Sequence, residues 1–397
     1  MSASDREFEY VSKLHGRQIR LLTILPSNTG DICCSVAVQS LDKQIPYIAL
    51  SYVWGDPISQ QRITCDGRAL EVTENLYQAI QHLKRKQLTE PLWIDAICIN
   101  QRDNQEKTYQ VQMMRDIYRE ASRVIVWLGK EEQTDRLAYA LIRRIVLAFE
   151  EFPPGMDYVK LPPGLPAVFY DPQWEYLRTF FNKPWFSRIW VVQELLMAKK
   201  SSFMCGTLEM ETEALLLAAY NVKHCHEAML SVQRTATSEE GVTMNNILDF
   251  SELWLDWQNG RRFSLWKLVC ILRNFKATDK RDMLFALVGL TDVDTSFIDY
   301  SKDPSHLLME FTLEMLQNGT TEEPSFAEVL SMTLSCRHDP SLPSWCLNLP
   351  AINARLLPFS NLAQFSKGIV QIPTDDNVGL SAISNQVCAY IWKYKYI

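Results

Sequence analysis

The feature that most constrains the fold is a pair of apolar segments separated by an amphipathic helical pattern. Residues 91–100, PLWIDAICIN, form a nearly continuous apolar run, which is typical of a strand buried on both faces. Residues 101–121 place Val111, Met114 and Tyr118 on one helical face, and RVIVWLG at 123–129 is a second apolar run. Strand, helix and strand in this order predict a βαβ unit with a right-handed crossover. We therefore expect an α/β fold with a mostly parallel sheet and flanking helices.

Further strand patterns precede this unit. They lie at residues 17–25, 31–40, 46–56 and 62–72. The last of them contains Asp66-Gly67, a strong hairpin signal, and Thr73 is a suitable cap for the helix that follows. Beyond about residue 210 the pattern becomes mainly helical. No internal repeat interrupts this order.

We expect three parts. Residues 1–205 form an α/β domain, residues 206–340 form a helical region packed on it, and residues 341–397 form an irregular C-terminal segment. The proline-rich stretch at 153–166 is interpreted as a linker or lid.

Charge and composition exclude several classes of partner. The net charge of −7 argues against nucleic acid as the main partner. No segment approaches the ~20 apolar residues of a membrane span, and the charged N-terminus does not resemble a secretory signal. We expect a cytoplasmic protein without membrane contact. The ten cysteines include no C-x-x-C pair, so we expect reduced thiols, and we expect no metal at His224 and His226.

The segment FNKPWFSRIWVVQELL, residues 181–196, contains an unusual acid. On a helix, Glu194 shares one face with Trp190, and a carboxylate against aromatic surface is costly unless it is hydrogen-bonded, paired or hydrated. Glu194 is therefore either an ordinary, partly exposed helix acid or part of a site. Since ligands collect beyond the carboxyl ends of parallel strands, Asp95 and the loop after Tyr52 should face the same crevice.

This placement gives the candidate site residues. Glu194 and Asp95 are the candidate acids for a catalytic role, and the substrate-binding candidates are Tyr52, Trp54, Gly55, Asp56, Asn100, Gln101, Trp185, Arg188 and Trp190. Asp95 needs donors, from backbone amides or Ser51. Arg188 can pair with a pyrophosphate or with Glu194. Glu106 competes as an acid but fits a capping box with Asp103.

Three segments together resemble the fungal heterokaryon incompatibility (HET) domain. They are YIALSYVWGD, LWIDAICINQRDNQEKTYQVQMMRDIYREASRVIVWLG and WFSRIWVVQEL, and residues 277–290 and 298–303 resemble segments that follow such domains. The resemblance implies a TIR/flavodoxin-like α/β fold, because HET domains are viewed as distant relatives of TIR domains. Enzymatic TIR members hydrolyse NAD with a glutamate in a Trp-x-x-x-Glu-Leu helix, which residues 190–195 resemble. By this analogy Glu194 is the catalytic acid.

The resemblance leaves three functions open. The first is an NAD-glycohydrolase-like enzyme of incompatibility and cell-death signalling, which uses NAD as substrate, needs no cofactor and acts after self-association. The second is a HET scaffold recruited to secondary metabolism as a cofactor-independent cyclase or pericyclase, of the Diels-Alderase type, for an apolar terpenoid or polyketide. The third is a non-catalytic interaction module. The absence of G-x-G-x-x-G, Walker, H-E-x-x-H and G-x-S-x-G motifs leaves hydride transfer, phosphoryl transfer and triad hydrolysis without support.

Overall fold

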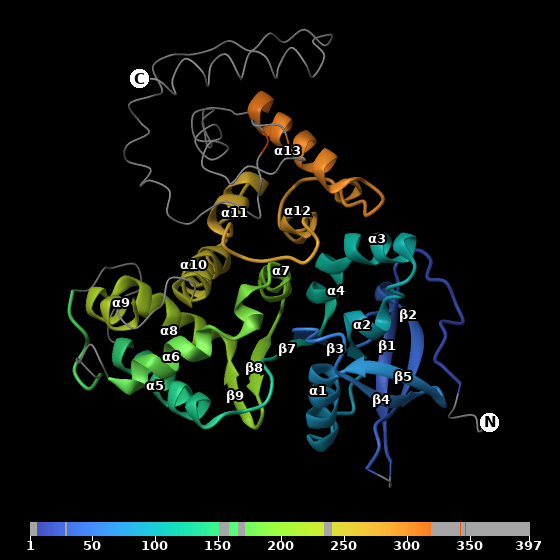
Figure 1. Cartoon of the computed structure of the whole chain (residues 1–397), viewed down its shortest axis with the longest axis horizontal. Helices are drawn as coiled ribbons and strands as arrows, with labels where there is room; N and C mark the ends of the chain where they lie inside the picture. The colour runs from blue at the N-terminus through green and yellow to red at the C-terminus, as the bar shows by residue number, and fades with distance from the viewer. Residues whose placement is uncertain are drawn as a thin grey trace.

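A nine-stranded sheet crosses the part of the chain that the computed structural model describes, which is residues 6–27, 30–150, 159–165, 171–233 and 240–318 with Leu342 and Cys346 (Figure 1). Its strands are β1 Gln18–Leu25, β2 Cys33–Ser40, β3 Ile48–Tyr52, β4 Gln60–Cys65, β5 Arg68–Thr73, β6 Leu92–Trp93, β7 Arg123–Trp127, β8 Ser201–Cys205 and β9 Leu208–Glu211. Their spatial order is β5-β4-β2-β1-β6-β3-β7-β8-β9.

The α/β class is confirmed, but the expectation of a mostly parallel sheet is wrong. Strands β6, β3, β7 and β8 run parallel at the centre of the sheet. Antiparallel pairs join β1 to β2, β1 to β6, β4 to β5 and β8 to β9, so four of the eight pairings are antiparallel. For β1–β2, β4–β5 and β8–β9 the physical reason is local, because consecutive strands joined by short turns must run antiparallel.

The β4–β5 hairpin shows how closely one of these turns follows the sequence. Asp66 and Gly67 have φ values of +50° and +73°, so both central residues adopt the left-handed conformation of a type I′ turn. Helix α1, Glu74–Arg85, begins directly after β5, and the Thr73 hydroxyl accepts from the backbone amide of Leu76.

The apolar run at 91–100 is buried as expected but is mostly not a strand. Only Leu92 and Trp93 form β6, and the chain then turns into the short helix α2, Asp95–Cys98. The amides of Ile97 and Cys98 both donate to the carbonyl of Ile94, which closes the turn. A continuous apolar run therefore indicated burial and not conformation.

The expected single helix after this run is broken in two. Helix α3 spans Asn104–Gln112 and helix α4 spans Met114–Glu120, with a break at Met113. Strands β6 and β7 both run parallel to β3 and lie on opposite sides of it. The two strands of the predicted strand–helix–strand unit are therefore parallel but not adjacent, because β3 lies between them.

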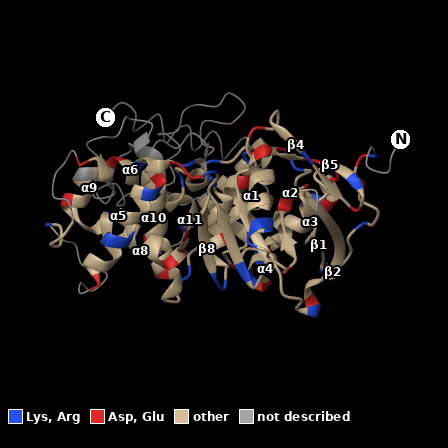
Figure 2. Ribbon diagram, turned by 90° about the horizontal axis from the view of Figure 1, so that it is seen from below, with Lys and Arg blue, Asp and Glu red and all other residues tan. Residues whose placement is uncertain are grey.

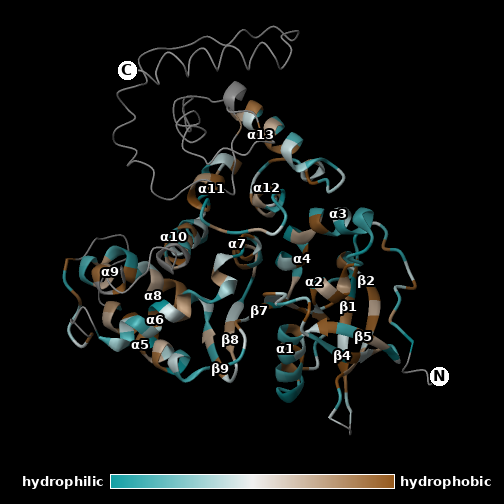
Figure 3. Ribbon diagram, in the orientation of Figure 1, coloured by the Kyte–Doolittle hydropathy of each residue, from teal (hydrophilic) through white to brown (hydrophobic). Residues whose placement is uncertain are grey.

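Two apolar cores cover the two faces of the sheet. Leu76, Ile80 and Leu83 of α1 pack on one face, against Leu50 and neighbouring residues of the central strands. The other face packs against α3, α4 and helix α7, Trp190–Leu196, in a core that continues into the helical half of the chain. In Figure 3 strands β1 and β2 are largely hydrophobic, whereas α1 shows mostly its hydrophilic colour.

The remaining elements are mostly helices. They are α5 Gln133–Phe149, α6 Pro172–Phe181, α8 Thr212–His224, α9 His226–Gln233, α10 Glu240–Gln258, α11 Leu265–Ile271, α12 Asp282–Val288 and α13 Pro304–Asn318, with the short 3-10 turns η2 Leu41–Lys43 between β2 and β3, η3 Pro184–Ser187 and η4 Thr295–Phe297. In Figure 1, α5, α6, α8 and α9 lie beyond β9, and α12 lies beside α7. Figure 2 shows positive and negative residues interspersed over the face in view.

The proposed division of the chain stays a prediction. The β8–β9 hairpin spans residue 205, and one apolar core includes residues on both sides of it. The lid expected at 153–166 lies outside the described residues except for 159–165, as does the segment 341–397 except for Leu342 and Cys346. Within the described residues, none of the helices has the length and apolar character needed to cross a membrane.

Candidate functional site

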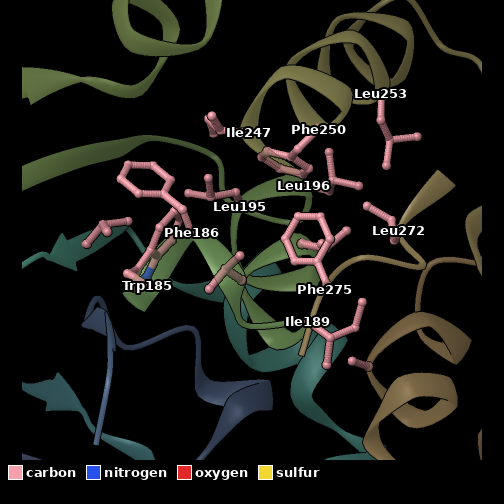
Figure 4. Packing of buried hydrophobic residues seen from close by; sticks show 14 of the residues in the cluster. Trp185, Phe186, Ile189, Leu195, Leu196, Ile247, Phe250, Leu253, Leu272 and Phe275 are labelled. Carbon is pink, nitrogen blue, oxygen red and sulfur yellow. The ribbon is translucent and has the colours of Figure 1, made fainter. Parts of the chain in front are cut away.

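Helix α7 carries Glu194 into the interior of the protein. Val191, Val192, Leu195 and Leu196 are all buried, so the short helix is apolar on nearly every side. Figure 4 shows Leu195 and Leu196 beside Ile247 and Phe250 of α10.

Glu194 itself is only 2% exposed. The expectation of a partly exposed acid is therefore wrong. The sequence pattern places neighbours along one helix, whereas this acid is covered by strands and helices from distant parts of the chain.

A hydrogen-bonded chain of three side chains ends at Glu194. The indole Nε1–H of Trp185, in η3, donates to Oγ of Ser51 at 2.8 Å. The Ser51 hydroxyl, on β3, donates in turn to Oε2 of Glu194. Trp185 and Ser51 are each 1% exposed, so all three hydrogen-bonded side chains are shielded from solvent. The aromatic neighbour that serves Glu194 is thus Trp185.

Burial raises the pKa of Glu194 to about 7. The positive charge of Arg188 and hydrogen bonding from Ser51 and Tyr118 oppose this rise, and the negative charge of Asp95 adds to it. A carboxyl group with this pKa is present in both protonation states near neutral pH. That property suits a group that takes up or releases a proton during a reaction.

Asp95 lies at the start of α2, at the end of β6, and is partly buried. Its Oδ2 accepts from the Trp54 indole Nε1 at 2.8 Å, and its Oδ1 accepts from the amide of Ala96 at 2.7 Å. The expected backbone amide is therefore present, but Trp54 takes the place foreseen for Ser51. Burial raises the pKa of Asp95, while Arg188 and these hydrogen bonds lower it. Asp95 keeps some contact with solvent, and this contact limits the rise of its pKa.

Arg188 acts on both acids through its charge without forming an ion pair with either. Its NH1 donates to the backbone carbonyl of Tyr52. Its positive charge lowers the pKa of both Glu194 and Asp95, although no nitrogen of Arg188 lies within 4.0 Å of either carboxylate. The expected direct pairing with Glu194 is replaced by a longer-range interaction. Arg188 therefore keeps donor capacity for an anionic group.

Two tyrosines complete the surroundings of the acids. The Tyr118 hydroxyl, on α4, faces Glu194 and lowers its pKa. The buried Tyr52 hydroxyl faces Asp95 closely enough to lower its pKa but makes no hydrogen bond of good geometry. The sequence pattern identified Tyr118 only as a core residue. No local signal distinguished it, because its position depends on how α4 packs against α7.

The loop after β3 forms the outer edge of the site. Trp54 is 41% exposed, and Gly55 has a φ of +83°, which favours glycine. A Cβ at Gly55 would lie 3.3 Å from Cβ of Asn75. Asp56 accepts from the amide of Ile58 within the same turn. The structure thus gives Trp54 a contact with Asp95, and Asp56 a local role in the turn.

The remaining candidates have local partners. The side-chain amide nitrogen of Gln101 donates to the backbone carbonyl of Asp95 at 3.0 Å. The side-chain carbonyl of Asn100 accepts from the backbone amide of Arg102. Trp190 turns away from the acid chain, since its indole faces Asp282 and opposes the rise in pKa that burial causes there. We expected Trp190 to lie in the site with Glu194, but it instead connects α7 to α12 through its interaction with Asp282.

Glu106 has a structural role, but not the expected one. Asp103 caps α3 by accepting from the amides of Gln105 and Glu106. The Glu106 carboxylate does not reach back to Asp103. It forms a buried ion pair with Arg20, with Oε2 accepting from NH2 at 3.0 Å, and accepts from the amide of Asn100 at 2.7 Å. The capping box failed because Arg20, on β1, offers a charged partner inside the core.

The described cysteines are free thiols. They are residues 33, 34, 65, 98, 205, 225, 270 and 346, while Cys336 and Cys388 lie outside the described residues. Within the described ranges, no group of three His, Cys, Asp or Glu residues is arranged to hold a metal ion.

The geometry defines a carboxylate pair at the carboxyl ends of parallel strands. Asp95 follows β6 and Ser51 lies near the end of β3, which is the edge where α/β sheets bind ligands. One acid is buried and titrates near neutrality, the other is partly open to solvent, and Arg188 supplies a positive charge to both.

Comparison with known proteins identifies the segment that carries this pair. Residues 47–194 match the family described as Heterokaryon incompatibility protein (HET), which confirms over this segment the resemblance seen in the sequence. The curated protein "Heterokaryon incompatibility protein 6, OR allele" of Neurospora crassa is 34% identical over 47% of this chain. The match covers 33% of that relative's length. No solved structure matches the chain.

Proposed function

We propose that this HET-domain protein takes part in fungal heterokaryon incompatibility, and that Glu194 and Asp95 cleave the bond between nicotinamide and ribose in NAD. The observation that carries the chemical part is the buried Glu194, whose pKa of about 7 makes it an effective base at neutral pH. The biological part rests on the HET domain and on the relative's name.

The reaction asks little of the protein beyond these groups. Breaking the carbon–nitrogen bond sends its electron pair to the nicotinamide nitrogen, which leaves as a neutral ring, and the ribose becomes oxocarbenium-like. Ionised Glu194 stabilises this positive charge and takes the proton from the attacking water. The products are nicotinamide, ADP-ribose and one proton. Arg188 is suited to the pyrophosphate, and Trp54 offers an exposed ring for stacking.

The structure corresponds to a closed form in this proposal. With Glu194 only 2% exposed, substrate entry requires the Trp54 loop or α7 to move. Trp54 is held to Asp95 by one hydrogen bond, so this loop is the simplest part to open. Self-association is the proposed trigger for that movement.

The test is NAD turnover by purified protein, measured as nicotinamide release over a range of protein concentrations. We expect turnover that increases with concentration and disappears in Glu194→Gln. The control is Glu71→Gln, which removes an exposed acid of β5 outside the carboxylate pair. Activity retained in Glu194→Gln, or no turnover at any concentration, contradicts the chemical proposal.

One observation favours a second candidate, the non-catalytic interaction module. Glu194 is almost fully buried, and the aromatic side chains of Trp185 and Phe186 pack against each other with almost no exposure. In that case Glu194→Gln leaves the incompatibility response in fungal cells unchanged.

The recruited cyclase gains no comparable support. The cavity found beside Ile19, Tyr47 and Glu120 has a volume of about 10 Å³, room for about one water, and lies away from the acids. Binding of apolar metabolites by a protein that does not turn over NAD is the result that would favour this function.

A further inference from the structure

The direction of each hydrogen bond in the buried chain is fixed by chemistry. An indole N–H can only donate, so the Ser51 oxygen must accept from Trp185. A hydroxyl has one proton, and within the described residues the acceptor found for the Ser51 proton is Oε2 of Glu194. If Oε2 instead carried a proton and donated it to Ser51, the Ser51 proton would be buried without an acceptor.

We propose that Ser51 and Trp185 are positioning residues that reserve Oε2 of Glu194 as a hydrogen-bond acceptor and leave Oε1 as the oxygen that meets substrate. The inference deepens the proposed function and rests on it for the identity of that substrate, a compound with a ribosyl bond to a neutral leaving group. Oε1 then receives the hydrogen bond of a ribose hydroxyl or the proton of the attacking water. Both charge states of Glu194 keep the same orientation, so the base needs no reorganisation when it takes up a proton.

The groups around Glu194 come from four places in the chain. Arg188 follows η3, Asp95 begins α2, Tyr118 lies on α4 and Ser51 lies on β3. Arg188 and Asp95 act through charge, and the Tyr118 hydroxyl faces the carboxylate and favours its ionised form. Ser51 holds Oε2 in place by a hydrogen bond. A change at Ser51 or Trp185 therefore tests orientation while the charges around Glu194 stay the same.

The direct measurement is the titration of Glu194 by carbon-13 NMR in protein labelled at the glutamate side-chain carboxyl carbons. The Glu194 signal is identified by its loss in Glu194→Gln, and the wild-type midpoint is expected at about 7. Ser51→Ala removes a donor that favours the ionised form, so the midpoint should rise by about half a unit to one unit. Ser51→Thr keeps the hydroxyl and should restore the wild-type midpoint.

Trp185→Phe provides an independent variant that keeps the ring packing. Without the indole donor, the Ser51 oxygen is free to accept from protonated Glu194, so the midpoint should rise in the same direction by a smaller amount. The matched control is Ser202→Ala, which removes a buried serine hydroxyl from the parallel strand β8, separated from β3 by β7, where Ser202 contacts Glu209. It should leave the Glu194 midpoint unchanged.

Equal midpoints in wild type, Ser51→Ala and Trp185→Phe would overturn the inference. If Ser51→Ala fails to fold, Trp185→Phe decides by the same criterion. The titration needs no turnover, which separates this inference from the proposed function. Shifted midpoints without NAD turnover in the wild type support the positioning role and refute the proposed reaction. Turnover with unshifted midpoints refutes the positioning role alone. Where turnover occurs, Ser51→Ala should lower kcat more than it changes KM.

Discussion

Replacing Glu194 by glutamine should make the protein increasingly more stable than the wild type as the pH rises. The pKa of Glu194 is raised by burial from 4.5 to about 7, a difference of about 2.5 units. At about 1.4 kcal/mol per unit, ionisation of this buried acid lowers the free energy of unfolding by about 3 kcal/mol.

The sign follows from proton binding. Between pH 4.5 and about 7 the folded protein holds the Glu194 proton more tightly than the unfolded chain does. Stability supplied by that proton is complete below pH 4.5 and is lost as the pH rises through about 7. Glutamine does not titrate, so the variant escapes this loss.

The difference in free energy of unfolding between the variant and the wild type also contains a contribution that does not change with pH. The glutamine carbonyl can accept from Ser51, but its NH₂ group brings buried donors into a site arranged for a carboxylate, at a cost of about 1–3 kcal/mol if they lack acceptors. This cost does not depend on pH. The slope of the stability difference, and not its value at one pH, is therefore the informative quantity.

The assay is urea unfolding of both proteins at several pH values between about 5 and about 8. We expect the difference in free energy of unfolding, variant minus wild type, to grow by about 2–3 kcal/mol over this range. Glu71→Gln, on the exposed face of β5, controls for the loss of a surface charge. A difference that stays flat with pH would refute the reasoning, because it would mean that Glu194 titrates equally in the folded and unfolded states.

Three further outcomes are expected. Glu106→Gln should lower the free energy of unfolding by about 3–5 kcal/mol, because it leaves the buried Arg20 without its charged partner; urea unfolding measures this, and a loss below about 1 kcal/mol would contradict it. Gly55→Ala should cost about 1–2 kcal/mol in thermal or urea unfolding, since φ is +83° and the new Cβ would press on Asn75, and an unchanged stability would contradict this assignment. NAD turnover, if Glu194 acts as the ionised base, should rise with pH through a midpoint of about 7, and a rate that falls over the same range would exclude that role.

Local patterns predicted the elements that depend on nearby residues. The Asp66-Gly67 turn and the Thr73 cap are both present, because each is decided by the conformational preference or hydrogen bond of residues within one turn. The burial of the 91–100 segment was also predictable. Its conformation was not, because a buried run satisfies the same apolar pattern as a strand or a short helix.

The site was predicted in part. The rule that ligands gather at the carboxyl ends of parallel strands pointed to Asp95, and the resemblance to the Trp-x-x-x-Glu-Leu helix pointed to Glu194. In the structure the positive charge of Arg188 acts on both acids. The sequence pattern missed the partner of Glu194, because Ser51 lies 143 positions away along the chain. It also assigned Trp190 to the site, since helical spacing gives the face of a side chain but not what packs on that face.

The sequence by itself determined the α/β class, the hairpin at Asp66-Gly67 and the match of residues 47–194 to the HET family, and it singled out the acids to test. Only the tertiary structure decided that the sheet is mixed, that Glu106 pairs with Arg20, and that Glu194 is buried on a chain from Trp185 through Ser51. The physical reason is the range of the interactions. Turns and caps are set by neighbouring residues, whereas the pKa of a carboxyl group depends on solvent exclusion and charges that distant segments bring to it.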